Sequence, residues 1–164
     1  MAGHRKAEKD AIELLEEAWD GELPVDPVRI AKELGVEVIG VSFKKDVSGA
    51  LVKKEGETDP TILLNIKDSR TRKRFSCAHE LGHYILRSSE PKPQYEYVDY
   101  RDQNSSTGTI EEERYANSFA ASLLMPEPAV KALHEQGLPT LRLAKKFGVS
   151  PEAMGNRLDN LGLS

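Results

Sequence analysis

The sequence has little of several residue types, and each scarcity excludes a class of protein. Its 164 residues include a single cysteine, so no disulfide can form within the chain. No apolar run approaches the roughly 20 residues that a membrane-spanning helix requires. The N-terminus, from Met1 to Lys6, lacks the apolar stretch of a signal peptide. These features predict a cytoplasmic protein that does not associate with a membrane.

The chain also lacks an excess of positive charge. Its formal net charge is −4 at pH 7, whereas binding along a nucleic-acid backbone requires a positive surface. Hydrophobic residues make up 38% and charged residues 30% of the chain, and its length suits one compact domain with a small appendage. We therefore do not expect direct binding to nucleic acid. The sequence does not define an oligomeric state.

The most informative segment is the H-E-x-x-H sequence from His79 to His83. Apolar residues around it recur at spacings of three and four, and proline is absent, which predicts a helix anchored in a core. Residues four apart lie on one face of a helix, so the two imidazoles can converge on one metal ion. Glu80 then points to where a metal-bound water would sit, and Gly82 leaves room for another element to approach. The pattern is typical of a zinc peptidase with Glu80 as general base.

A catalytic zinc site needs a third protein ligand and one open position. The best candidate lies in a second predicted helix, residues 110–126, which is acidic at its start, apolar along one face and closed by a proline. Glu113 shares the apolar face, whereas Glu112 and Glu111 point progressively away from it. Asn117, one turn further on, is placed to hydrogen-bond a ligating histidine. The predicted metal ligands are His79, His83 and Glu113.

Residues 74–83 followed by residues 113–126, in this order and spacing, resemble the ImmA/IrrE family of metallopeptidases. The resemblance extends from residue 36 to about residue 126 and includes 48–51 and 62–65, which match strands that this family carries before its metal helix. It implies a gluzincin-like zinc site with Glu80 as the catalytic residue. It also implies a cytoplasmic protease that inactivates a helix-turn-helix repressor, in mobile-element induction or a stress response. The site residues that the resemblance implies are His79, His83, Glu113 and Glu80.

Periodicity upstream of the metal helix predicts two helices, at residues 5–19 and 27–34, and three strands, at residues 36–43, 49–53 and 61–66. Because the connections between the strands are short, they favour an antiparallel meander. The predicted fold class is therefore α+β, with a small antiparallel three-stranded sheet packed on a zincin-like helical core. The second strand is the candidate edge for a peptide substrate that adds by β-augmentation; an inner strand is the alternative.

Residues 88–109 combine prolines, serines and tyrosines without a persistent period, which predicts a long loop between the two metal-bearing helices. It is either flexible or a flap over the cleft, and none of its tyrosines is assigned a catalytic role. Cys77 is expected to be a buried thiol on the face opposite the histidines. His4 is expected in a fraying terminus and His134 at the surface.

The C-terminal residues 141–163 predict a pair of helices that resembles a helix-turn-helix. One helix ends at Gly148, and Ser150 caps the next. Few of its side chains suit base recognition, so we expect a packing or protein-binding role. The side chains suited to base edges are Asn156, Arg157 and Asn160. The predicted organisation is a metallopeptidase domain of residues 1–126 with a C-terminal helical subdomain, residues 127–164, packed on it.

Three functions fit these features. The first is a zinc-dependent endopeptidase that cleaves a protein, with Zn²⁺ preferred over other divalent transition metals. The second is a non-catalytic repressor- or DNA-binding regulator that uses the C-terminal helix pair and holds a structural metal. The third is a protease fold that sequesters its target without turnover. Glu80 favours the first over the second, because a structural zinc site has no use for a carboxylate at this position.

Overall fold

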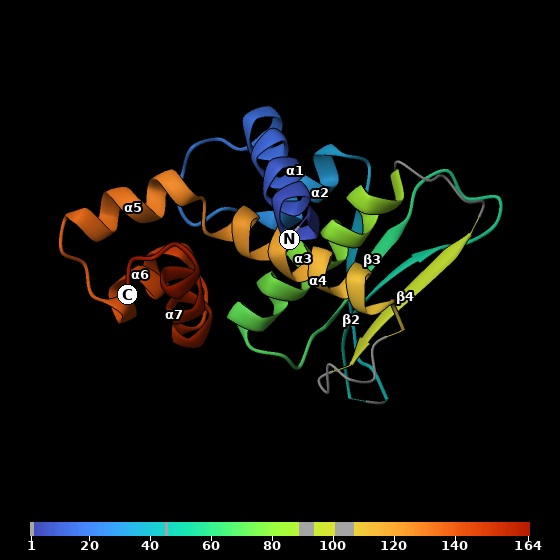
Figure 1. Cartoon of the computed structure of the whole chain (residues 1–164). Coiled ribbons are helices and arrows are strands. Elements are labelled where there is room, and N and C mark those ends of the chain that lie inside the picture. The colour runs from blue at the N-terminus through green and yellow to red at the C-terminus, as the bar shows by residue number, and fades with distance from the viewer. Residues whose placement is uncertain (1, 45, 89–93, 101–106) are drawn as a thin grey trace.

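The chain folds as a four-stranded sheet with helices around it, in a computed structural model that describes residues 2–44, 46–88, 94–100 and 107–164 (Figure 1). The helices are α1 (Ala2–Ala18), α2 (Pro27–Glu33), α3 (Arg70–Ser88), α4 (Ile110–Leu124), α5 (Glu127–Glu135), α6 (Thr140–Phe147) and α7 (Pro151–Asn160). The strands are β1 (Glu37–Val41), β2 (Val47–Lys53), β3 (Thr61–Asn65) and β4 (Tyr95–Tyr100). Within the described ranges, no helix has the length and apolar character needed to cross a bilayer.

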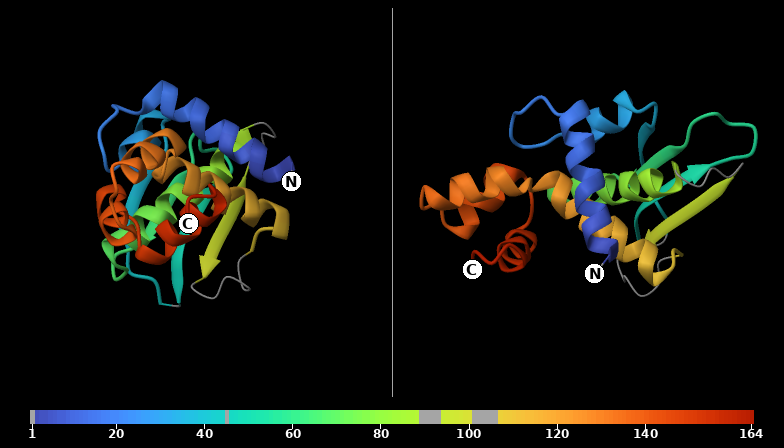
Figure 2. Two further views of the ribbon diagram at one scale, coloured as in Figure 1. Left: turned by 60° about the vertical axis from the view of Figure 1, so that its left-hand side comes forward. Right: turned by 45° about the horizontal axis from the view of Figure 1, so that its top comes forward.

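The helix α3 lies at the centre of the fold, between the sheet and α4. It contacts β2, β3, α2 and α4, and α1 lies across α4. The helices α5 to α7 form a cluster at one end of the molecule, away from the sheet (Figure 2). The motif from His79 to His83 therefore lies where the sheet and the second predicted metal helix meet.

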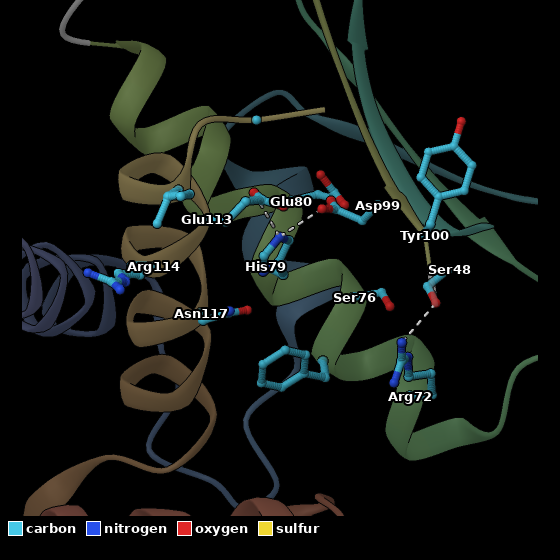
Figure 3. Close-up of a pocket in the computed structure, with 13 residues that line it drawn as sticks. Ser48, Arg72, Ser76, His79, Glu80, Asp99, Tyr100, Glu113, Arg114 and Asn117 are labelled. Carbon is cyan, nitrogen blue, oxygen red and sulfur yellow. Dashed lines mark hydrogen bonds and ion pairs between the residues drawn. The ribbon is translucent and has the colours of Figure 1, made fainter. Parts of the chain in front are cut away.

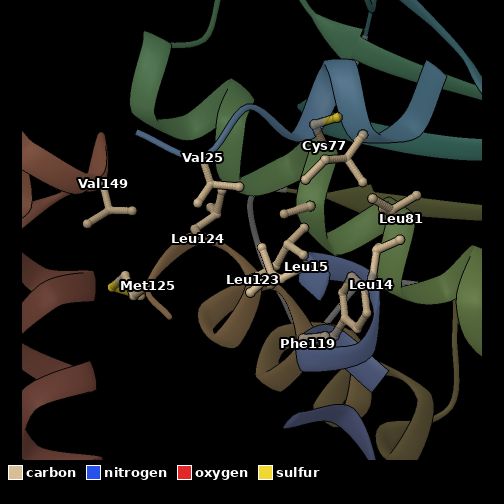
Figure 4. Packing of buried hydrophobic residues seen from close by; sticks show 14 of the residues in the cluster. Leu14, Leu15, Val25, Cys77, Leu81, Phe119, Leu123, Leu124, Met125 and Val149 are labelled. Atoms are coloured by element: carbon tan, nitrogen blue, oxygen red, sulfur yellow. The ribbon is translucent and has the colours of Figure 1, made fainter. Parts of the chain in front are cut away.

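The core forms where α1, α3 and α4 pack together (Figure 4). The apolar faces that the sequence predicts for α1 and α4 are confirmed. Each large apolar side chain buried in this way contributes about 1.5–3 kcal/mol relative to exposure. The buried residues on these two faces are Ala7, Ala11, Leu14, Leu15 and Ala18 of α1, and Ala116, Phe119, Ala120, Leu123 and Leu124 of α4.

The predicted helix boundaries in the C-terminal pair are also confirmed. Gly148 ends α6 in the left-handed conformation, with φ 66°, which a glycine adopts without strain. The Ser150 side chain then accepts a hydrogen bond from the backbone N–H of Ala153 and caps α7. The pair is attached to the rest of the fold by Arg74, whose Nε donates to the Gly148 carbonyl at 3.0 Å.

The sheet differs from the predicted three-stranded antiparallel meander in order and direction. The strand order is β1-β3-β2-β4, with β1 parallel to β3 and the other pairs antiparallel. The burial pattern gives the reason. The first five residues of β2 are all buried, which suits an inner strand, whereas β1 is largely exposed and suits an edge. Short connections alone did not reveal this difference between the two strands.

The predicted edge strand is also wrong. Residues 49–53 form part of β2, which lies between β3 and β4. The edge strand next to β2 is β4, which forms within the segment 88–109 that the sequence predicts to be a loop. Its register pairs Tyr97 with Leu51 and Asp99 with Gly49. The remainder of that predicted loop includes residues 89–93 and 101–106, which lie outside the described residues.

The prediction that Gly82 permits a close approach is confirmed by the packing of α3 against α4. A Cβ atom at Gly82 would lie 3.1 Å from the Cα of Ala116 and 3.1 Å from a ring carbon of Phe119. Both neighbours belong to the buried core, so neither can move freely. This contact sets the distance between the two helices that carry the candidate ligands.

We expect Gly82→Ala to lower the free energy of unfolding by about 1–3 kcal/mol, because the added methyl group overpacks the interface between α3 and α4. Gly155→Ala is the matched control, since a Cβ there meets no atom within 4 Å. The control should stabilise α7 by about 0.5–1 kcal/mol, the difference between alanine and glycine within a helix. Urea unfolding of both variants measures the effect, and equal stability would contradict the proposed packing role of Gly82.

Candidate metal centre

The packing of α3 against α4 brings together His79, His83 and Glu113. The Nε2 atom of His83 lies 2.5 Å from Oε2 of Glu113. The Nε2 atom of His79 lies 3.5 Å from the same oxygen, and Figure 3 shows these two side chains facing one another. The two histidines are 7% and 1% exposed, and the Glu113 side chain is 18% exposed. The three residues predicted as ligands therefore meet at one point, where the same nitrogen of each ring faces the carboxylate.

A fourth residue, Asp99 of β4, joins this cluster. Its Oδ1 lies 3.2 Å from Nε2 of His79. One donor atom from each of His79, His83, Asp99 and Glu113 lies within 4.8 Å of the others, so the group could hold a metal ion. Asp99 is not among the ligands predicted from the sequence, because residues 88–109 have the composition of a loop.

Two residues of β4 are about as far apart as the two histidines of α3, so each of them can contact one histidine. Tyr97 and Asp99 share one face of β4, about 6.7 Å apart along the strand. His79 and His83 are one turn apart, about 6 Å along the helix. The Tyr97 ring stacks on His83 with centroids 4.3 Å apart and an interplanar angle of 11°, while Asp99 contacts His79. Each histidine is thereby matched with one residue of β4.

The polar atoms of this cluster fit a divalent metal ion. Buried polar atoms in proteins almost always have a hydrogen-bond partner. Among the described residues, no hydrogen-bond partner is found for Nε2 of either histidine, for either carboxylate oxygen of Glu80, or for one oxygen each of Asp99 and Glu113. Imidazole nitrogens and carboxylate oxygens are the donors that Zn²⁺ takes in catalytic sites. The donor set is therefore suited to zinc or a related transition metal.

Glu80 lies beneath the sheet at the edge of this cluster and is fully buried. The strand β2 passes close above it, since a Cβ at Gly49 would lie 3.4 Å from Oε2 of Glu80. Burial raises the pKa of Glu80 well above its ordinary value, and the neighbouring Asp99 and Glu113 raise it further. Burial would lower the pKa of His79, but contacts with Asp99 and Glu113 raise it to about 9.

Glu112 has different partners from Glu113. Its carboxylate accepts hydrogen bonds from Arg87 at 2.8 Å and from the Tyr97 hydroxyl at 2.5 Å. It also forms a capping box with Thr109 at the start of α4. Burial opposes the charged form, but the bonds with Tyr97, Thr109 and Arg87 lower the pKa of Glu112 to about 2. Glu112 therefore supports the helix start and the Tyr97 ring, and it lies outside the group that converges on the histidines.

Other residues considered in the sequence have simpler environments. Asn117 lines the cleft, and no hydrogen bond joins it to the ring nitrogens of His79 or His83 in the part of the chain that the structure describes. Cys77 is 0% exposed, as expected, and burial raises its pKa to about 12. His4 is exposed and lies beside Ser118 of α4. His134 is half-buried on α5, remote in sequence and structure from the cluster.

The cluster opens into a cleft of about 490 Å³. Arg72, Phe75 and Asn117 line this cleft and also line a second groove of about 890 Å³, whose opposite wall is α7. Arg72 donates a hydrogen bond to the Ser48 hydroxyl at 3.1 Å across the cleft floor. The two cavities therefore share part of their lining, between the candidate metal centre and the C-terminal helices.

Comparisons with known proteins match most of the sequence. The sequence profile of a peptidase family, described as the IrrE N-terminal-like domain, matches residues 31–159. The chain is 34% identical over 104 residues to the radiation response metalloprotease IrrE of Deinococcus radiodurans, covering 59% of this chain and 31% of that protein. A solved structure described as a Mycobacterium tuberculosis transcriptional regulator aligns with a TM-score of 0.48 and 16% identity, covering 96% of this chain and 45% of that one. The chain thus spans less than half the length of either relative.

Proposed function

Because the chain belongs to the peptidase family of the IrrE N-terminal-like domain, we propose that it is a zinc-dependent endopeptidase. The observation that carries this proposal is the convergence of His79, His83 and Glu113 beside the buried carboxylate of Glu80, at the base of a cleft. These three residues would hold the metal as protein ligands. When bound, the ion would supply a Lewis acid that polarises the scissile carbonyl and makes a water molecule more acidic.

Glu80 has the role of general base. Its carboxylate accepts the proton of the attacking water and then transfers that proton to the leaving amine. Full burial beneath β2 restricts the position of the side chain, and its charged neighbours include Asp99 and Glu113. Tyr97 positions His83, because its ring stacks on the imidazole while Glu112 accepts a hydrogen bond from its hydroxyl.

The proposed substrate is a cytoplasmic helix-turn-helix transcriptional repressor, cut in a linker or in a partly opened helix. Cleavage would relieve repression in mobile-element induction or a stress response, as the family resemblance implies. A peptide in such a cleft has to be extended, so an intact helix does not enter it. On the outer strand β4, the N–H and carbonyl of Val98 are already bonded to Thr107, so they cannot pair with a substrate strand. The cleft walls are therefore the better-supported substrate contacts.

The groove between α4 and α7 supports docking of the substrate through the C-terminal helix pair. Asn156 and Asn160 of α7 line it opposite Ser122 of α4. Ser122 is 5% exposed, and its hydroxyl has no hydrogen-bond partner among the described residues. These polar groups suit the backbone and side chains of a polypeptide. Specificity would then rest on contacts outside the cleft, within residues 127–164 that we propose as a helical subdomain.

The alternative, a regulator that binds DNA through the same helix pair, has less support. Arg157 is the one arginine among the predicted base-reading side chains, and it is 5% exposed. Its Nε donates to the Met125 carbonyl at 3.0 Å, which ties α7 to the end of α4. An arginine used in this way is not available to a guanine edge.

The test is to incubate the zinc-loaded protein with a candidate repressor encoded nearby. We expect a single cut that a chelator abolishes and that added zinc restores, with loss of operator binding by the repressor. An unrelated unfolded protein is the control for general proteolysis. Equal cleavage of that control, with no cut in the repressor, would leave a general peptidase and reject the proposed substrate.

A further inference from the structure

Asp99 contacts the histidine nitrogen that faces the metal centre, and this position defines its role. A carboxylate that only orients a metal-ligating histidine accepts a hydrogen bond from the ring nitrogen that points away from the metal. Asp99 instead lies 3.2 Å from Nε2 of His79, the same atom that faces Glu113. Its own side chain is 13% exposed. Asp99 is therefore on the metal side of the ring rather than behind it.

With Asp99 included, the cluster has one donor more than a catalytic zinc site uses. A catalytic zinc keeps three protein ligands and one open position, whereas four protein ligands close a tetrahedral site. His79, His83, Glu113 and Asp99 supply four donor atoms within 4.8 Å of one another. Asp99 also lies against Glu80, beside which the attacking water has to be placed. In this arrangement the Asp99 carboxylate stands where the nucleophile belongs.

We propose that Asp99 is a displaceable fourth metal donor that closes the site, and that its withdrawal opens the position that water requires. This inference rests on the proposed metal site, and it adds a latent state to the proposed peptidase. Asp99 reaches the centre from the sheet, whereas the other three donors come from the packed helices α3 and α4. It can therefore leave while the other three stay in place.

The pairing of β2 with β4 is irregular beside Asp99. The register between the two strands shifts between Val47 and Gly49, opposite Tyr100 and Asp99. Such bulges redirect side chains beside active sites. After Tyr100 the described chain resumes at Thr107, which bonds Val98, and a Cβ at Gly108 would lie 3.1 Å from Oε2 of Glu113. The backbone at Gly108 is thus packed closely against Glu113, whereas Asp99 lies at an irregular point in the pairing of β2 with β4.

Azide binding to the Co²⁺-substituted protein tests the proposal without any turnover. Azide occupies an open metal position and changes the visible absorption of Co²⁺. If about nine in ten molecules are closed, the apparent azide affinity falls about tenfold relative to the open site. We therefore expect Asp99→Ala to bind azide about ten times more tightly than the unsubstituted protein. Asp99→Asn, which keeps the shape of the side chain, should lie between them.

Glu96→Ala is the matched control, because Glu96 is an exposed carboxylate on the same strand; it should bind azide like the unsubstituted protein. Equal azide affinity in the unsubstituted protein and in Asp99→Ala would overturn the proposal. Loss of Co²⁺ from a folded Asp99→Ala variant would also overturn it, because Asp99 would then be a permanent ligand. Failure of the unsubstituted protein to bind Co²⁺ would instead reject the proposed metal site itself.

Discussion

Replacement of Glu80 by glutamine is expected to abolish peptide hydrolysis while the protein keeps its fold and its metal. Glutamine has nearly the same size, so it fills the fully buried space beneath β2. It cannot accept the proton of the attacking water. General-base catalysis is typically worth about 10²–10⁴-fold, so the specific rate should fall by at least that factor.

The measurement is the rate of repressor cleavage under single-turnover conditions, with zinc content determined on the same sample. Glu111→Gln is the matched control, since Glu111 is an exposed glutamate in the first turn of α4. The control should cleave at the unsubstituted rate. Cleavage by a zinc-loaded Glu80→Gln variant at a near-normal rate would reject Glu80 as the general base.

Replacement of Glu113 by alanine is expected to have the second largest effect, on metal occupancy. Its carboxylate lies 2.5 Å from His83 and 3.5 Å from His79, and these contacts place it at the centre of the donor set. Loss of one of three protein ligands should lower zinc affinity by at least the 10–100-fold that removal of an outer partner costs. Zinc per chain, measured after dialysis against a weak chelator, reports the loss.

Glu112→Ala separates the metal role from a helix-capping role. Glu112 belongs to the capping box and bonds Arg87 and Tyr97. Its replacement should cost about 0.5–2 kcal/mol of stability, as loss of a helix cap does, while zinc remains bound. A protein that loses zinc with Glu112→Ala and retains it with Glu113→Ala would reverse the assignment of the third ligand.

The helices could be predicted from the sequence because their apolar faces, caps and terminators are local. Asp26 accepts hydrogen bonds from Val28 and Arg29 at the start of α2, and Ser150 caps α7 as predicted. The sheet order could not be derived in the same way. The pairing of β1 with β3 rather than with β2 depends on burial, which is a property of the whole fold.

The candidate site was predictable where its residues share a helix face. His79, His83 and Glu80 follow from helical spacing, and Glu113 follows from the buried face of α4. Asp99 could not be predicted from helical spacing, because it lies on the strand β4. That strand is short, and the segments on either side of it are rich in proline and serine. The alternation of Tyr95, Tyr97 and Asp99 on one strand face was the available signal, and it identifies a half-buried strand. Contact with the histidines is visible only once β4 is paired with β2.

The central claim is a single metal centre formed by α3 and α4, and a crystal structure of the zinc-loaded protein tests it most directly. Anomalous scattering at the zinc edge should give one peak, bonded to Nε2 of His79, Nε2 of His83 and the Glu113 carboxylate at about 2.0–2.2 Å. Asp99 should approach the same ion from β4. A zinc peak bonded by Glu112, or a zinc-loaded crystal in which Glu113 faces solvent, would contradict this account.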